Sequence, residues 1–265
     1  MSAVLFQKEI KSNGKLWGIF ALVLAMYASV IVAMFDPKLG ESLNMMTQSM
    51  PEVFAIFGML DVGSTMVEFV ANYLYGFLLI GFPLVFIVLL SMRLVARYVD
   101  RGSMAYLLAT PNKRRRLALT QAVVLLLGIF LLVGFVTVLC LIVSGAMFPG
   151  ELDTGAFLAL NTGLFCLLVL LGGVCFFSSC LFSDTRNAGG LGAGLTIGFI
   201  LLQMLSRVGD KFDWLKYLTP LTLYDTSGLI AGDSSAWLWS ILLLVFGLLL
   251  FGAGILVFCR RDLPV

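Results

Sequence analysis

The sequence contains no histidine, and only 12% of its 265 residues are charged. The absence of histidine excludes imidazole general bases and histidine-ligated metal sites. None of the five cysteines belongs to a Cys-x-x-Cys pair, so we interpret them as packing residues within apolar runs. Soluble domains carry about 25% charged residues. The low charge, together with 60% hydrophobic residues, therefore indicates a multi-pass membrane protein.

The chain also lacks a phosphate-binding loop. Its Gly14-Lys15 pair is followed by Leu16 rather than by serine or threonine, and the upstream glycine of such a loop is missing. The Gly-x-Ser-x-Gly and His-Glu-x-x-His motifs of common hydrolases are missing too. We therefore expect this chain not to be an enzyme and to bind no cofactor or metal itself.

Six apolar stretches are long enough to cross about 30 Å of hydrocarbon at 1.5 Å per residue. No Asp, Glu, Lys or Arg falls in the central part of any stretch, which argues against a carrier coupled to ions or protons. We expect an all-α membrane protein with one transmembrane domain, kinked at Pro83 in the second span. The predicted spans are residues 16–35, 73–92, 117–148, 156–182, 188–205 and 236–258.

Residues 1–15 precede the first span and have the pattern of an amphipathic helix lying along the membrane surface. A solvated tail remains the alternative. The predicted apolar face holds Ala3, Phe6 and Ile10, and the opposite face holds Lys8, Lys11 and Lys15.

Basic residues are concentrated on one side of the predicted membrane. Six spans place both termini on the same side, and the positive-inside rule assigns that side to the cytoplasm. Most acidic residues fall on the other side. The basic residues predicted outside are Lys38, Arg207, Lys211 and Lys216.

The densest positive charge lies in residues 93–116, between the second and third spans, with Asp100 as its one acidic residue. Within it, Met104, Leu107 and Leu108 form one apolar helical face at spacings of three and four residues. Pro111 then ends this short helix, because the residue before a proline is pushed out of helical geometry. Such a segment beneath a membrane is suited to contacting a partner on the cytoplasmic side.

Gly190, Gly194 and Gly198 recur every four residues and line one face of the fifth span. Small residues at this spacing let another helix approach closely. The neighbour is either a span of the same chain or a second membrane subunit, and the sequence leaves both interpretations open.

Few polar side chains lie within the spans, and we interpret them as partners in hydrogen bonds between helices rather than as substrate ligands. A pathway through such spans would be mostly apolar, which suits an amphipathic or lipid-like cargo. These polar residues are Thr137, Asn161, Thr162, Ser178, Ser179 and Gln203.

The chain resembles the membrane (permease) subunits of type-2 ATP-binding-cassette exporters over nearly its whole length. The amphipathic N-terminal helix is similar to the elbow helix of that family. Three segments resemble its cytoplasmic segment, the outer connection of one bacterial subgroup and its last outer connection before the sixth span, respectively. They are DRGSMAYLLATPNKRRR at 100–116, MPEVFAIFGM at 50–59 and YLTPLTLYDTSGLIAG at 217–232.

The resemblance implies a dimer of membrane subunits, each docked through a cytoplasmic coupling helix on a separate ATPase subunit that binds ATP and magnesium. Ala105 departs from the family, because many relatives carry a glutamate there; a salt bridge to the ATPase is then missing or shifted to Asp100. The residues expected to touch the ATPase are Asp100, Arg101, Gly102, Ser103, Met104, Tyr106, Leu107 and Leu108.

We therefore predict a permease subunit that exports a drug, peptide antibiotic or lipid across a bacterial cell membrane, with no nucleic-acid partner. Two other classes remain: a membrane-embedded interaction or sensory protein without transport, and a secondary carrier. The sequence identifies neither the cargo nor whether the second permease is a copy of this chain.

Overall fold

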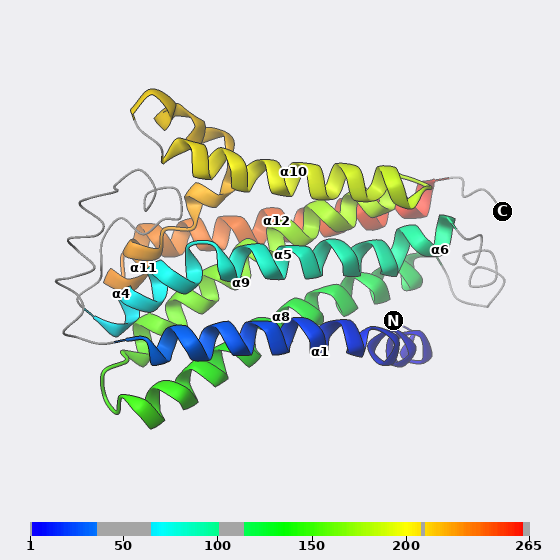
Figure 1. The fold of residues 1–265 in the computed structure, drawn as a ribbon. Helices are drawn as coiled ribbons and strands as arrows, with labels where there is room; N and C mark the ends of the chain where they lie inside the picture. The colour runs from blue at the N-terminus through cyan, green and yellow to red at the C-terminus, as the bar shows by residue number, and fades with distance from the viewer. Residues whose placement is uncertain (1, 36–64, 101–113, 208–209, 262–265) are drawn as a thin grey trace.

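The computed structural model describes residues 2–35, 65–100, 114–207 and 210–261 (Figure 1). These residues form helices and connections without a strand, and six helical stretches are long and apolar enough to cross a membrane. The predicted all-α fold with six spans is thereby confirmed. The stretches are α1 (Ala3–Ala33), the run from α5 to α6 (Leu78–Asp100), α8 (Arg114–Met147), α9 (Thr154–Leu181), α10 (Thr185–Ser206) and α12 (Ser234–Arg260).

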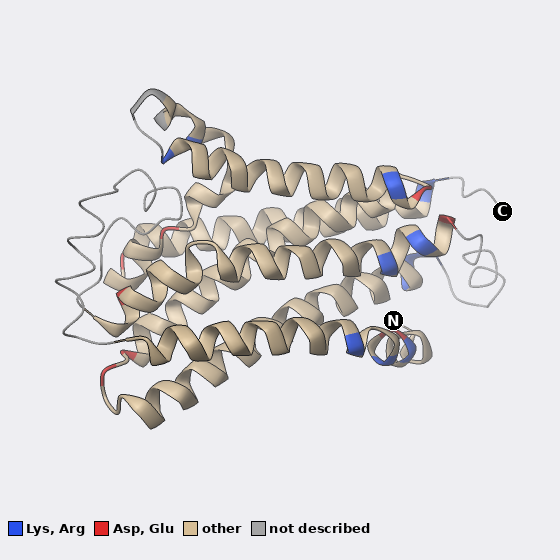
Figure 2. Ribbon diagram, viewed as in Figure 1, with Lys and Arg blue, Asp and Glu red and all other residues tan. Residues whose placement is uncertain are grey.

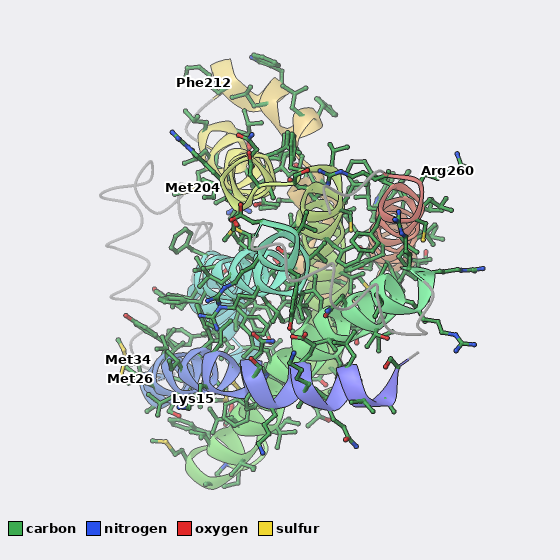
Figure 3. All side chains as sticks on the ribbon, turned by 90° about the vertical axis from the view of Figure 1, so that its right-hand side faces the viewer. Lys15, Met26, Met34, Met204, Phe212 and Arg260 are labelled. Atoms are coloured by element: carbon green, nitrogen blue, oxygen red, sulfur yellow. The ribbon has the colours of Figure 1, made fainter. Side chains whose placement is uncertain are left out.

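Helix α1 runs from Ala3 to Ala33 without a break in its assignment, but it bends sharply near Lys15. Figures 1 and 3 show the first turns lying across the end of the bundle, while the rest of α1 runs along it. The described part of the predicted elbow, residues 2–15, is thus helical and lies across the rest of α1, and its position along a membrane surface stays a prediction. Its protein-facing side differs from the predicted apolar face, because it holds Leu5, Glu9 and Asn13.

The second span is built from several short pieces. Thr65 caps the first piece: its hydroxyl accepts a hydrogen bond from the Glu68 N–H, and the Glu68 carboxylate accepts one from the Thr65 N–H. The helix is interrupted at Phe77, whose φ is −139°, and Pro83 lies inside the following helix. The pieces are α4 (Met66–Val70), a π-helical turn η1 (Ala71–Tyr75), α5 (Leu78–Ser91), a second π-helical turn η2 (Met92–Ala96) and α6 (Arg97–Asp100).

Helix α9 forms the centre of the bundle. Most of its side chains are buried, and it packs against α5, α8, α10 and α12. Its crossing with α12 is close because Gly173 faces the backbone of Gly247, and Gly247 faces the backbone of Leu170. A Cβ added at Gly173 would lie 2.7 Å from the Gly247 carbonyl oxygen, so neither position has room for a side chain.

Helices α10 and α12 are joined by short helical turns, η3 (Asp210–Leu218), η4 (Pro220–Leu223) and α11 (Thr226–Ala231). The Asp225 carboxylate caps α11 by accepting a hydrogen bond from the Gly228 N–H. Gly232 ends α11 in the left-handed region, with φ of 77°, where glycine is favoured. These turns cover one end of the bundle, opposite the end at which both termini lie (Figure 1).

Candidate functional sites at the two ends of the bundle

The described charges divide between the two ends of the bundle (Figure 2). Most of the lysines and arginines lie at the end that holds the termini, which we call the basic end. Most of the acidic residues, including Glu151, Asp153, Asp225 and Asp233, lie at the opposite, acidic end. The basic end contains hydrogen bonds between distant segments, and the acidic end contains a cleft with polar lining residues.

At the basic end, the elbow portion of α1 is attached to the bundle through a buried carboxylate. Glu9 is only 2% exposed, and it accepts hydrogen bonds from the Tyr98 hydroxyl at 2.6 Å and from the Gln121 amide at 3.5 Å. The Asn13 amide donates to it within α1, and the Lys8 ammonium lies 5.8 Å from the centre of the Tyr98 ring. Glu9 thus joins the elbow to α6 and α8, a role that sequence reasoning missed.

The segment 101–113 lies outside the described residues, but hydrogen bonds hold the residues on both sides of it. On one side, the Thr185 hydroxyl at the start of α10 donates to the Asp100 carboxylate. On the other side, the Arg114 guanidinium donates to the Arg261 carbonyl oxygen at 2.9 Å. The Arg261 side chain in turn donates to the Cys180 carbonyl oxygen at 3.1 Å and to the Ser183 hydroxyl.

Of the eight residues expected to touch an ATPase, the structure describes Asp100, which is exposed and bonded to Thr185. The other seven, Arg101 to Leu108 without Ala105, lie outside the described residues, as does the motif at 50–59. The structure therefore shows how the residues on either side of 101–113 are bonded, and the coupling role and contact residues of the segment stay predictions.

The glycine stripe on α10 faces away from the rest of the described chain. A Cβ added at Gly190, Gly194 or Gly198 would meet no atom within 4 Å. Packing of α10 inside the chain instead uses Gly192, whose Cβ would lie 3.3 Å from the Cys175 Cα. The described chain therefore offers no intramolecular neighbour for the stripe, and a neighbour from a second subunit stays a prediction.

The polar side chains within the spans bond differently from the prediction. Thr137, Asn161 and Thr162 donate to carbonyl oxygens four residues earlier in their own helices. The prediction of contacts between helices was wrong for Thr137 and Thr162, because a backbone carbonyl one turn earlier is always in reach. It was right for Ser178, which donates to the Ala188 carbonyl oxygen of α10 at 2.7 Å.

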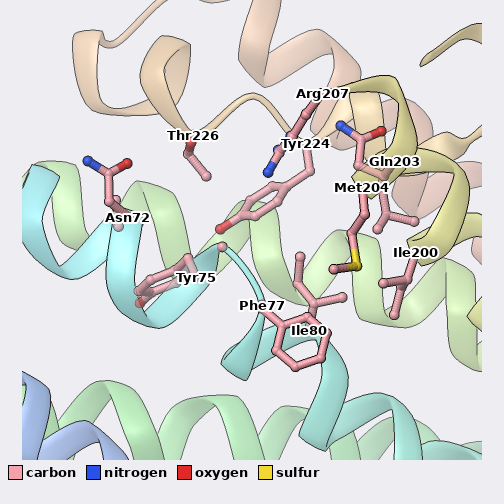
Figure 4. A pocket seen from close by; sticks show the side chains of 13 residues that line it. Asn72, Tyr75, Phe77, Ile80, Ile200, Gln203, Met204, Arg207, Tyr224 and Thr226 are labelled. Atoms are coloured by element: carbon pink, nitrogen blue, oxygen red, sulfur yellow. The ribbon is translucent and has the colours of Figure 1, made fainter. Parts of the chain in front are cut away.

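At the acidic end, an open cleft of about 1260 Å³ lies between the second span, the end of α10 and the turns that follow it. A narrower pocket continues from it between α5 and α10 (Figure 4). Its polar lining includes Asn72, Gln203, Arg207, Tyr224 and Thr226. Its apolar lining includes Phe77, Ile80, Ile200 and Met204.

Arg207 is the cation of this pocket. It follows the last residue of α10, and Figure 4 shows its guanidinium beside the Tyr224 ring. Burial lowers the pKa of Arg207 from its ordinary value and raises the pKa of Tyr224 well above its own. Tyr224 is anchored, because its hydroxyl donates to the Leu160 carbonyl oxygen at 3.2 Å. Within the described part of the chain, no side chain forms a hydrogen bond or ion pair with the Arg207 guanidinium.

Comparison with known proteins identifies a family. The model of a family described as "Protein of unknown function (DUF2705)" matches residues 22–264. This chain belongs to the DUF2705 family. No curated protein and no solved structure matches the chain.

The region shared with the DUF2705 family includes Tyr98, Arg207 and all three glycines of the α10 stripe, whereas Glu9 precedes it. In the described part of this DUF2705 chain, no three His, Cys, Asp or Glu residues are grouped as a metal site would require. Four of the five cysteines are buried in the spans and Cys259 is partly exposed, and all five are free. Buried free cysteines are typical of packing residues, as the sequence analysis interpreted them.

Proposed function

We propose that this chain is the permease subunit of an ATP-driven exporter that moves an amphipathic or lipid-like substrate out across a bacterial cell membrane. A separate ATPase subunit would dock on residues 93–116 and supply the energy. The proposal rests on the family resemblance of the sequence, and one structural observation supports it: the anchoring of both flanks of segment 101–113.

The anchoring gives a docked partner a mechanical connection to several helices. Asp100 is bonded to α10, and Arg114 is bonded to the residue that follows α12. Arg261 extends this connection to the C-terminal end of α9. Coupling between distant sites requires about 1–3 kcal/mol, which a few hydrogen bonds to charged groups can supply. A displacement of the segment would therefore act on α9, α10 and α12 together.

We further propose that a second permease subunit packs on the α10 glycine stripe. Gly190, Gly194 and Gly198 leave an open strip on a helix whose neighbouring leucines are also exposed, among them Leu191 and Leu195. Close approach of two helices over small residues gains van der Waals contact that lipid chains provide less well.

The first test is to purify the full chain from its native host in mild detergent, identify co-purifying proteins and measure ATP hydrolysis. A bound ATPase is expected, together with ATP-dependent export of fluorescent amphiphilic dyes or labelled lipids from proteoliposomes. Asp100→Lys and Thr185→Val should retain hydrolysis and lose transport about tenfold, the effect of one hydrogen bond to a charged group. Glu151→Lys, an exposed change at the acidic end, serves as the control.

A solitary, inactive chain would overturn the exporter proposal and favour a membrane interaction or sensory protein. Transport that disappears when an ion gradient is collapsed, with no ATPase present, would indicate a secondary carrier. Normal transport in both the Asp100 and Thr185 variants would remove the coupling role of this anchor.

The test of assembly compares two open glycines. Gly194→Leu should shift a purified dimer toward monomer on a native gel, because the added side chain projects into the proposed interface. Gly252→Leu, on α12 and equally free of neighbours within 4 Å, should leave the dimer intact. Equal behaviour of the two variants would contradict the proposed interface.

A further inference from the structure

The pocket at the acidic end has two chemically different sides. Arg207, Asn72 and Thr226 lie on the side toward the end of the bundle, as Figure 4 shows. Ile80 and Ile200 lie on the side toward the spans. A ligand that satisfies both sides must carry a polar group and an apolar portion.

The carboxylates that line the wider cleft are already engaged elsewhere. Asp225 accepts hydrogen bonds from the Gly228 N–H at 3.1 Å and from the Ser227 hydroxyl at 2.7 Å. Glu68 accepts one from the Thr65 N–H at 3.1 Å. Neither forms an ion pair with Arg207. The guanidinium is thus partly withdrawn from water without a described counter-charge.

A partly buried cation of this kind favours an anionic ligand. Arginine stays protonated at neutral pH even when burial lowers its pKa, and its planar donors match phosphate and carboxylate oxygens. Among the other polar groups, the Gln203 side-chain oxygen is already bonded to the Thr222 hydroxyl at 2.8 Å. Arg207 is therefore the group best placed to select the charge of a ligand.

The apolar side of the pocket offers a surface for part of a hydrocarbon chain. Phe77 is 39% exposed because the helix is interrupted there, and its ring lies near Ile80 in Figure 4. Ile200 and Met204 on α10 form the facing wall. The pocket itself encloses only about 50 Å³, enough for part of a chain, and it opens into the cleft of about 1260 Å³, which is large enough for the rest of a ligand of drug or lipid size.

We propose that this pocket and the cleft it opens into bind an amphiphile with an anionic phosphate or carboxylate head, held by Arg207, and an apolar chain of which one part enters between α5 and α10. One part of this inference rests on the proposed function, namely that the bound amphiphile is the exported substrate. Binding itself needs no ATPase. A membrane lipid headgroup and a free amphiphile share this chemistry, and the experiment below separates them.

The test measures binding of dodecyl phosphate to the purified full chain in neutral detergent by native mass spectrometry. Arg207→Gln should weaken binding about tenfold, as expected for a lost charge-assisted hydrogen bond. Arg207→Lys should retain most of it. Arg186→Gln is the matched control, because Arg186 is an exposed arginine at the other end of the same helix.

The apolar part of the pocket is tested independently of Arg207. Ile200→Ala should weaken dodecyl phosphate binding more than octyl phosphate binding, because only the longer chain reaches the full wall. This variant keeps the test decisive if Arg207→Gln does not fold. Inorganic phosphate and dodecyltrimethylammonium should not compete at concentrations at which dodecyl phosphate saturates the site.

Unchanged binding in Arg207→Gln, or equal competition by inorganic phosphate or by the cationic amphiphile, would overturn the inference. Displacement of dodecyl phosphate by phosphatidylglycerol in lipid nanodiscs would support the site and assign it to a membrane lipid. Retained binding in those nanodiscs would support a free amphiphile. Because no ATPase takes part, loss of the exporter proposal would leave these results unaffected.

Discussion

The two ends of the bundle differ in how their charged side chains are bonded. At the basic end, Glu9, Asp100 and Arg114 are each bonded to a residue far away in the chain. At the acidic end, Asp225 caps its own helix, and Arg207 faces a cleft without a described partner. Bonds between distant segments fix helices relative to one another, whereas an unpartnered cation beside a cleft is available to a ligand. The comparison separates an end that can transmit motion from an end that can recognise a molecule.

The largest effect is expected from removing the carboxylate at the basic end. Glu9→Ala removes the carboxylate that accepts hydrogen bonds from the half-buried Tyr98 hydroxyl and the buried Gln121 amide, at a cost of about 1–3 kcal/mol for the buried amide and less for the hydroxyl. The melting temperature in detergent should fall by several degrees. Lys11→Ala, an exposed change on the same helix, should leave it unchanged. Equal melting of both variants would mean that the elbow contributes little to stability.

A smaller effect is expected at the anchored wall of the cleft. Tyr224→Phe removes the hydrogen bond to the Leu160 carbonyl oxygen and should destabilise the chain by about 1 kcal/mol at pH 8. Burial raises the pKa of Tyr224 above that of the unfolded chain, so its stabilisation is complete below about pH 10 and declines at higher pH. The difference in melting between wild type and variant should therefore shrink at pH 10.5.

The control for the pH series is Tyr217→Phe, because Tyr217 is 80% exposed. Its difference from wild type should be small and should not change between pH 8 and pH 10.5. A difference for Tyr224→Phe that is equally independent of pH would contradict burial of the Tyr224 hydroxyl in the folded chain.

The smallest effect on stability is expected at Arg207, and its sign should be opposite. Arg207→Met removes a partly buried cation that has no described partner, so the ligand-free chain should be as stable as wild type or more stable by up to about 1 kcal/mol. Side chains that serve ligand binding often lower the stability of the ligand-free fold. Thermal melting without added amphiphile tests this. A loss comparable to that of Glu9→Ala would show that Arg207 is a structural residue and would break the contrast between the two ends.

The spans could be predicted from the sequence because they depend on local composition. Long apolar stretches without charge give helices whose bounds lie within a few residues of those predicted, as for residues 117–148 and α8. The second span differed more, since its helix is interrupted at Phe77 and extends to Asp100. An uninterrupted apolar stretch in the sequence does not show where π-helical turns will interrupt the helix.

The contacts could not be predicted because they join residues that are distant in the chain. In the sequence, Glu9 has the pattern of a surface charge. Its burial depends on Tyr98, which is 89 residues later in the chain and bonds to it in the fold. The regular spacing of Gly190, Gly194 and Gly198 suggested a packing face, yet the close crossing inside the chain uses Gly173 and Gly247, which share no local pattern. Arg207 carries no local signal beyond its place at the end of an apolar helix.

The bond between Glu9 and Tyr98 also has a consequence for biosynthesis. A ribosome adds about 5–20 residues each second, so on the order of ten seconds separate the synthesis of these two residues. During that interval Glu9 cannot form its bonds with Tyr98 and Gln121, because those residues have not yet been made. The elbow is therefore synthesised before the second and third spans, but its docking must wait until they have been inserted.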